Sequence, residues 1–240
     1  MATDKKQALT AIGILAVLSI YLFFVTTNVN PQLGLIYNGL AILSIGLIIA
    51  DQLFGKRTIK LINRNVSWGK ALLWGIGGYI ALIASVQLTS LLAEFIPLTE
   101  ILSLLGASAP VFSNSALINF FTFGGVIAFL ETYALFIALP DLMASIFNIE
   151  ISKRNILNPK VLTLITAIST IFLLLHVTAK GIGSEAILIL VFLMAFISLV
   201  ITFMTNDSRP ALILHIVANS IAATSIFAII KLSSVLTVFG

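Results

Sequence analysis

Residues 186–204 read AILILVFLMAFISLVITFM, an apolar run without a charged side chain. An α-helix rises about 1.5 Å per residue, so about 20 apolar residues cross the hydrocarbon core of a bilayer. This run therefore predicts a transmembrane helix. Six further runs qualify in the same way: 8–27, 33–54, 70–93, 115–139, 161–179 and 211–231.

The composition agrees with a chain that lies almost wholly in lipid. Hydrophobic residues make up 60% of the 240 residues and charged residues 9%, whereas soluble domains contain about 25% charged residues. A soluble core cannot bury so much apolar surface, but lipid accepts it. No long polar segment interrupts the chain, so we expect residues 1–240 to form a single membrane domain of the all-α class.

The charges between the apolar runs predict an orientation. The N-terminus and the loops 55–69 and 140–160 are rich in lysine and arginine, whereas segment 94–114 has acidic residues and no basic ones. Under the positive-inside rule this alternation predicts about seven spans, with the N-terminus inside and the C-terminus outside. The loop lengths and the lack of a transit peptide favour a multi-pass protein of a prokaryotic cell membrane. The net charge of +4 then reflects topology, and we expect the lipid bilayer as partner and no nucleic acid.

Two connecting segments and a set of glycines refine this bundle. Segments 97–108 and 141–151 carry apolar residues at helical spacing, and either can form an interfacial helix and bring the number of hydrophobic helices to eight. Glycines inside the third and fourth runs predict close helix packing through small residues. They are Gly75, Gly77, Gly78, Gly124 and Gly125.

Few ionisable side chains lie within the apolar runs, and each is a candidate functional residue because burial of charge in lipid is costly. Glu131 lies in the fourth run, His176 in the fifth and His215 in the seventh, with Asn219 one helical turn later. A carboxylate and an imidazole can activate water, and a second imidazole with an amide can stabilise an oxyanion. These four residues suffice for peptide hydrolysis without metal.

Other interpretations of the same residues stay open. Glu131 can be a proton-relay site, and either histidine can bridge helices by hydrogen bonds. Two histidines and a glutamate can also bind a divalent metal, although no HExxH motif is present. The chain has no cysteine, which excludes thiolate chemistry. We expect neither a cofactor nor a metal.

The polar residues stand in short motifs. Phe172-Leu-Leu-Leu-His176 and His215-Ile-Val-Ala-Asn219 match the patterns FxxxH and HxxxN, and Glu131-Thr132-Tyr-Ala-Leu-Phe136 partly matches EExxxR. In this order the motifs resemble those of the CPBP family of membrane glutamic proteases, which includes CAAX-processing and bacteriocin-immunity proteins. The resemblance covers residues 115–231, while residues 1–114 carry no family signal.

The resemblance implies roles for the four residues. Glu131 and His176 would activate water, and His215 and Asn219 would support the oxyanion. The first motif departs from the family, because Thr132 stands at its second glutamate and Phe136 at its arginine.

A count of residues along the helices raises a question of depth. His176 counts nearer the outer face than Glu131 and His215. A tilted or short fifth helix, with Val177–Glu185 dipping into a cavity, would bring the three together.

Three functions follow. The first is a CPBP-type intramembrane endopeptidase that acts on a membrane-associated peptide or protein. The second is a catalytically impaired protein of the same fold that serves as a scaffold, immunity factor or subunit of a membrane complex. The third is a small transporter that uses Glu131 as a proton or cation site.

Overall fold

The computed structural model describes residues 31–54, 65–93, 120–180 and 185–221, together with Gly13, Val17 and Ile20. These residues form helices and connecting turns without a strand, which confirms the all-α class for this part of the chain. The elements are α2 (Pro31–Phe54), α3 (Trp68–Ala93), the π-helical η1 (Phe120–Ile127), α6 (Ala128–Tyr133), the π-helical η2 (Ala134–Ala138), α7 (Leu139–Ile146), the 3₁₀-helical η3 (Lys153–Asn155), α8 (Pro159–Lys180) and α9 (Glu185–Thr205). A last helix covers 209–221.

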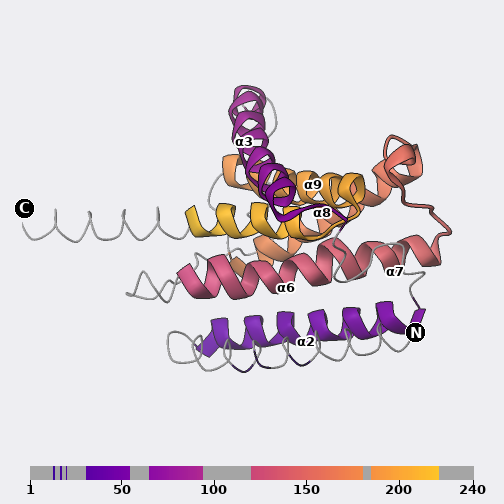
Figure 1. Ribbon diagram of the computed structural model, residues 1–240. Helices are drawn as coiled ribbons and strands as arrows, with labels where there is room; N and C mark the ends of the chain where they lie inside the picture. Colours follow the sequence, from indigo (N-terminus) through magenta and orange to yellow (C-terminus); the bar gives the residue numbers. More distant parts are fainter. Residues whose placement is uncertain are drawn as a thin grey trace, which may run out of the picture.

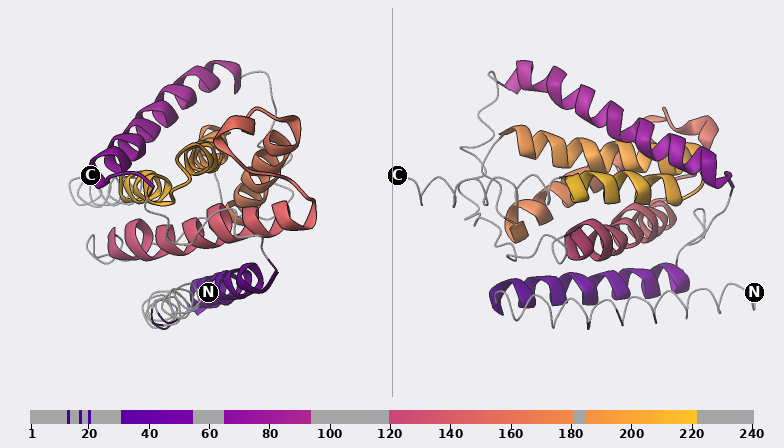
Figure 2. Two further views of the ribbon diagram at one scale, coloured as in Figure 1. Left: turned by 45° about the vertical axis from the view of Figure 1, so that its right-hand side comes forward. Right: turned by 60° about the vertical axis from the view of Figure 1, so that its left-hand side comes forward.

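One helix lies at the centre of the described structure. Elements η1, α6, η2 and α7 follow one another without a break over residues 120–146, and we call them together the central helix. Helix α2 packs along one side of it, and α8 and α9 contact it on another side (Figure 1). Helix α9 contacts both α8 and α3, and α3 runs obliquely across the bundle (Figure 2). The central helix therefore contacts α2, α8 and α9.

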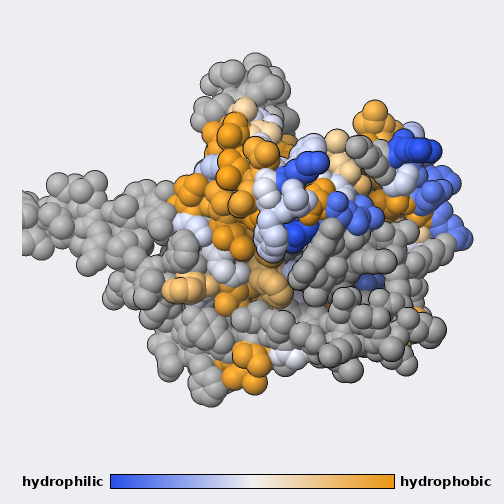
Figure 3. Space-filling model, in the orientation of Figure 1, coloured by the Kyte–Doolittle hydropathy of each residue, from blue (hydrophilic) through white to orange (hydrophobic). Residues whose placement is uncertain are grey.

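The surface of the described helices is strongly apolar. Large side chains such as Leu73 (74% exposed) and Ile80 (63%) on α3, and Leu53 (69%) on α2, face outward, and Figure 3 shows apolar residues gathered over α3. Exposed apolar area of this extent marks contact with lipid rather than water. Among the described residues, three helices are long and apolar enough to cross a membrane: Gly124–Ile146, Pro159–His176 and Leu188–Thr205.

The predicted runs and the observed helices agree where both can be compared. Residues 33–54, 70–93, 161–179 and 186–204 all lie within single helices. The first run and segment 97–108 fall almost wholly outside the described residues, as does the end of the seventh run. The count of about seven spans and the orientation of the termini therefore stay predictions.

The fourth predicted span ends in the wrong place. It was expected to stop before Pro140, with residues 141–151 as a separate segment, but the central helix continues through Pro140 to Ile146. Proline usually breaks a helix because its ring meets the carbonyl group four residues earlier. Here the preceding turn is π-helical, with the Leu139 N–H bonded to the Ala134 carbonyl five residues back. We attribute the tolerance of Pro140 to this wider turn.

Small residues let three helices approach one another closely, as predicted. A Cβ atom built on Gly75 would lie 2.6 Å from Ile213 and 3.0 Å from the carbonyl oxygen of Pro210. One on Gly78 would lie 2.6 Å from Ile201 and from Leu214, and one on Gly124 would overlap Ser220. The last helix is thus held against α3 on one side and the central helix on the other. Gly77 and Gly125 have open space around them.

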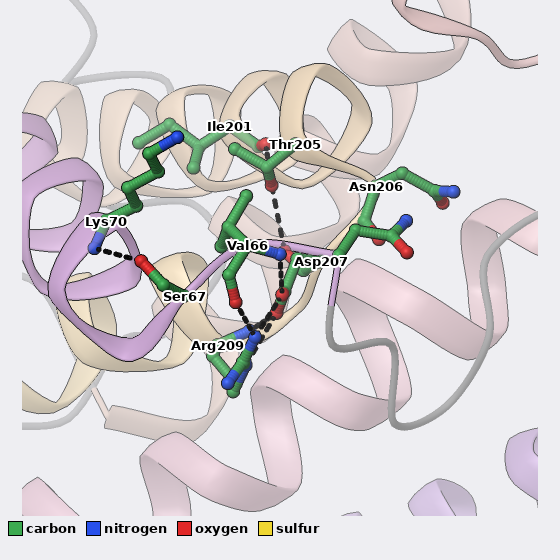
Figure 4. Close-up of polar contacts among 9 residues, drawn as sticks. Val66, Ser67, Lys70, Ile201, Thr205, Asn206, Asp207 and Arg209 are labelled. Atoms are coloured by element: carbon green, nitrogen blue, oxygen red, sulfur yellow. Dashed lines mark hydrogen bonds and ion pairs between the residues drawn. The ribbon is translucent and has the colours of Figure 1, made fainter.

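The turn 206–209 connects α9 to the last helix and meets the residues before α3 (Figure 4). Asn206, with φ of 48°, ends α9 in the left-handed conformation. The Asn65 side-chain amide donates to the Asn206 carbonyl (2.9 Å), and the Val66 N–H donates to Asp207 Oδ2 (3.2 Å). Residues 65–66 and the turn 206–209 therefore lie at the same end of the described helices.

Gly75 and Gly77 provide a matched test of this packing. We expect Gly75→Ala to lower the free energy of unfolding by about 1–3 kcal/mol, because the added methyl group overpacks the contact with Ile213 and Pro210. Gly77→Ala on the same helix is expected to be neutral or to stabilise by up to about 1 kcal/mol, since only helix propensity changes. Unfolding in detergent measures both, and equal stability of the two variants would contradict the close contact.

The stability of the protein at acidic pH tests the hydrogen bonds of Asp207 in the turn 206–209. Burial alone would raise the pKa of Asp207, but hydrogen bonds from the Arg209 side chain, the Arg209 N–H and the Val66 N–H outweigh it and hold this pKa below its usual value. The resulting stability is present above the unfolded-state pKa, about 3.9, and is lost as the pH falls through the folded-state pKa. We expect Asp207→Asn to be less stable than wild type at pH 6 and to lose less stability on acidification, as measured by unfolding in detergent.

Candidate functional site

Three of the four predicted site residues meet at one point in the bundle. Glu131 comes from α6 in the central helix, His176 from α8 and His215 from the last helix. His215 Nε2 lies 3.1 Å from Glu131 Oε2, and His176 Nε2 lies 3.7 Å from Glu131 Oε1. The exposed fractions are 2% for Glu131, 7% for His176 and 0% for His215. One carboxylate thus faces two imidazoles from separate helices, out of contact with lipid.

The question of depth is resolved by the true lengths of the helices. Glu131 lies about 22 Å along the central helix from its end at Ile146, and His176 lies about 26 Å along α8 from its start at Pro159. These two helix ends belong to one short connection, so the two side chains reach the same level. Helix α8 is unbroken to Lys180, so the predicted irregular backbone is wrong for residues 177–180. Residues 181–184 lie outside the described part.

Two consecutive residues of the central helix, Glu131 and Thr132, lie against the two ring nitrogens of His215. The Thr132 hydroxyl lies 3.1 Å from Nδ1, and Glu131 faces Nε2. A carboxylate only accepts hydrogen bonds, so the proton of a neutral His215 is assigned to Nε2, and the Thr132 hydroxyl donates to Nδ1. The facing Nε2 and Oε2 atoms are at ion-pair distance but outside hydrogen-bond alignment.

His176 has the opposite arrangement of protons. Its Nδ1 lies 2.9 Å from the carbonyl oxygen of Phe172, one turn earlier in α8. A carbonyl group only accepts, so Nδ1 carries the proton of a neutral ring and Nε2 presents its lone pair toward Glu131. His215 therefore offers a donor to the Glu131 carboxylate, whereas the lone pair of His176 faces another acceptor and can bond to Glu131 only when one of the two groups carries an additional proton.

Aromatic rings surround the two imidazoles. The Phe172 ring lies 4.1 Å from that of His176 and 5.7 Å from that of His215, and the Phe136 ring lies 5.6 Å from His215 and 5.2 Å from Phe172, between centroids. Both phenylalanines are fully buried. Phe136 lies in the π-helical η2, five residues after Glu131. In this conformation the two phenylalanine rings lie against both imidazoles.

The remaining predicted residue and one unpredicted residue complete the description. Asn219 lies one turn beyond His215 in the last helix and is partly buried, and its role toward an oxyanion stays a prediction. In the sequence, Thr132 stands out only as a departure from the motif EExxxR. The structure gives it a hydrogen bond to His215, and its position next to Glu131 was the signal that could have identified it.

Among the described residues, no group of three or more histidine, cysteine and acidic side chains has the arrangement of a metal site. Comparison of the chain with models of known families, with curated proteins and with solved structures finds no match. The resemblance to membrane glutamic proteases therefore stays a prediction that depends on the three short motifs.

Substitutions at Thr132 test the orientation of His215. Thr132→Val keeps the shape of the side chain but removes the hydroxyl donor, so the buried Nδ1 of His215 loses its partner. We expect a loss of about 1–3 kcal/mol in the free energy of unfolding, measured by unfolding in detergent. Thr132→Ser keeps the hydroxyl and should retain more of the stability. A valine variant as stable as wild type would show that this hydrogen bond does not form.

Proposed function

We propose that the protein is an intramembrane endopeptidase that hydrolyses a membrane-associated peptide or protein without a metal. The observation that carries the proposal is the convergence of Glu131, His176 and His215 from three helices, at 3.1 and 3.7 Å. Glu131 and His215 are 84 positions apart in the sequence. All three residues are among those that the resemblance assigns to catalysis.

The proposed chemistry uses one water and the three side chains. Glu131, assisted by the Nε2 lone pair of His176, takes a proton from the water as its oxygen attacks the peptide carbonyl carbon. The Nε2–H of His215, with Asn219, donates hydrogen bonds to the oxyanion that forms. The proton then passes from Glu131 to the nitrogen of the leaving amine as the C–N bond breaks. Each residue acts on an atom that changes charge during the reaction.

Access to the centre requires a movement. Glu131 is 2% exposed and His215 fully buried, so a substrate and a water reach the carboxylate only when a neighbouring ring moves. Phe136 is the best placed, because it packs on both Phe172 and His215. Turnover would therefore depend on rotation of this ring or on a separation of helices.

Glu131→Gln tests the mechanism. The amide cannot take a proton, so we expect cleavage of susceptible membrane peptides to fall by at least about 10²-fold. The assay is proteolysis of a panel of labelled transmembrane and lipidated peptides in proteoliposomes. Glu150→Gln, an exposed acidic residue between α7 and η3, is the matched control and should cleave like wild type.

Two results would contradict the proposal. Equal cleavage by wild type and Glu131→Gln would remove the assigned base. Loss of wild-type cleavage on treatment with a metal chelator would replace the metal-free mechanism with a metal-dependent one.

A second candidate is a non-catalytic scaffold or subunit of a membrane complex. The observation that favours it is the apolar enclosure, with Phe136 fully buried against His215. In that case the Glu131–histidine contacts serve only to join three helices, and wild type would leave every peptide intact. Phe136→Ala separates the candidates further, since opening the enclosure should raise cleavage only if the centre is catalytic.

A further inference from the structure

We propose that Arg209 and Asp207 are positioning residues, which hold the start of the last helix so that the imidazole of His215 keeps one orientation and one tautomer toward Glu131. The inference deepens the proposed function and rests on it for what the imidazole does. The contacts that carry it lie in the turn 206–209, outside the site described above (Figure 4).

Asp207 is the acceptor around which this turn is organised. It is fully buried, and its Oδ1 accepts hydrogen bonds from the backbone N–H and from Nε of Arg209, both at 3.0 Å. Its Oδ2 accepts from an Nη of Arg209 at 2.6 Å and from the Val66 N–H at 3.2 Å. The bond to the backbone N–H also satisfies one of the free donors at the start of the last helix.

Arg209 carries the connection to α3. The same terminal nitrogen that bonds to Asp207 donates to the Val66 carbonyl oxygen, and the guanidinium lies 4.8 Å from the ring centroid of Trp68, the first residue of α3. The Asp207 carboxylate binds the edge of the planar guanidinium, and the Trp68 ring packs on its face. These two contacts together fix its orientation. Lysine cannot reproduce this geometry, because its ammonium group is a single point of charge.

Ser208, between these two residues, connects the turn to the central helix. Its side chain interacts with that of Tyr133, the residue next to Thr132. The last helix is thus joined to the central helix at two levels, through Ser208 with Tyr133 and through His215 with Thr132. A displacement at the turn would change the geometry of the second contact.

The distance from the turn to the site is short and lies along a regular helix. Arg209 and His215 are six residues apart, about 9 Å along the axis, and the Gly75 contacts hold the same stretch against α3. A helix of two turns moves as a rigid unit, so a shift or rotation at its start appears at His215 with little loss. Hydrogen-bonded site groups tolerate displacements of only about 0.5 Å. The turn therefore lies where it can set the imidazole.

The two histidines of the chain allow a direct test. Protein labelled with ¹⁵N only in its histidines shows two imidazoles in an NMR spectrum, and His176→Gln identifies the signals of His215. The full chain is compared in lipid nanodiscs as wild type, Arg209→Lys, Arg209→Met and Ser208→Ala. Arg154→Met, which removes an exposed arginine in η3, is the matched control.

We expect wild type and Arg154→Met to show His215 as a single Nε2–H tautomer. Arg209→Lys and Arg209→Met should give a second set of His215 signals or strong broadening, and a smaller change in those of His176, which shares Glu131 and Phe172 with His215. A single set of His176 signals reports that the variants are folded, because α8 is not joined to the turn by the contacts above. Ser208→Ala should give a smaller change of the same kind, and it decides the outcome if the arginine variants split the His176 signals as well.

His215 signals identical to wild type in the folded arginine variants and in Ser208→Ala would overturn the proposal and leave the turn with a role in stability alone. The proposed hydrolysis fails separately. If wild type cleaves no peptide but the His215 signals respond as expected, the positioning holds and the catalytic function is wrong.

Discussion

Burial of the Glu131 carboxylate is the constraint on which the rest of the structure depends. A carboxylate in the interior of a membrane protein is costly unless polar groups face it, and here His176 and His215, on two other helices, lie 3.7 and 3.1 Å from it. Three helices therefore have to meet at one level with defined rotations about their axes. The contacts of Thr132 and Phe172 with the imidazoles fix those rotations, so the electrostatic requirement and the helix packing support one another.

The last helix shows how much of the architecture serves this meeting point. It bears His215, and it contacts α3 through Gly75 and Gly78 and the central helix through Gly124. Small residues at these positions let the backbones come close, since lipid supplies no hydrophobic force between helices. Its start is held by Asp207 and Arg209, whose charges compensate each other. Packing and ion pairing thus act at successive levels of one helix.

The sequence predicted the helices well and the relations between them in part. Long apolar runs are sufficient to locate α2, α3, α8 and α9, because the thickness of the bilayer sets the length of a spanning helix and hydropathy identifies it. Glu131, His176 and His215 could be identified from the sequence because ionisable side chains are rare in the apolar runs, where their burial costs free energy.

The features that the sequence did not predict depend on tertiary context. The end of the central helix was placed too early because Pro140 is a breaker in an α-helix, and no sequence rule indicated the π-helical turn before it. The hydrogen bond of Thr132 and the ion pair in the turn 206–209 were missed as well, since both partners of each are recognised only when the chain is folded.

The π-helical stretch η2 (Ala134–Ala138) has a consequence for how this chain can change over evolution. A π-helical turn holds one residue more than an α-helical turn, so loss of one residue between Glu131 and Pro140 would restore a regular α-helix. That deletion would turn everything from Leu139 to Ile146 by about 100° relative to Glu131 and bring Pro140 against a carbonyl group. The extra residue of this turn and the proline that follows it therefore accommodate each other.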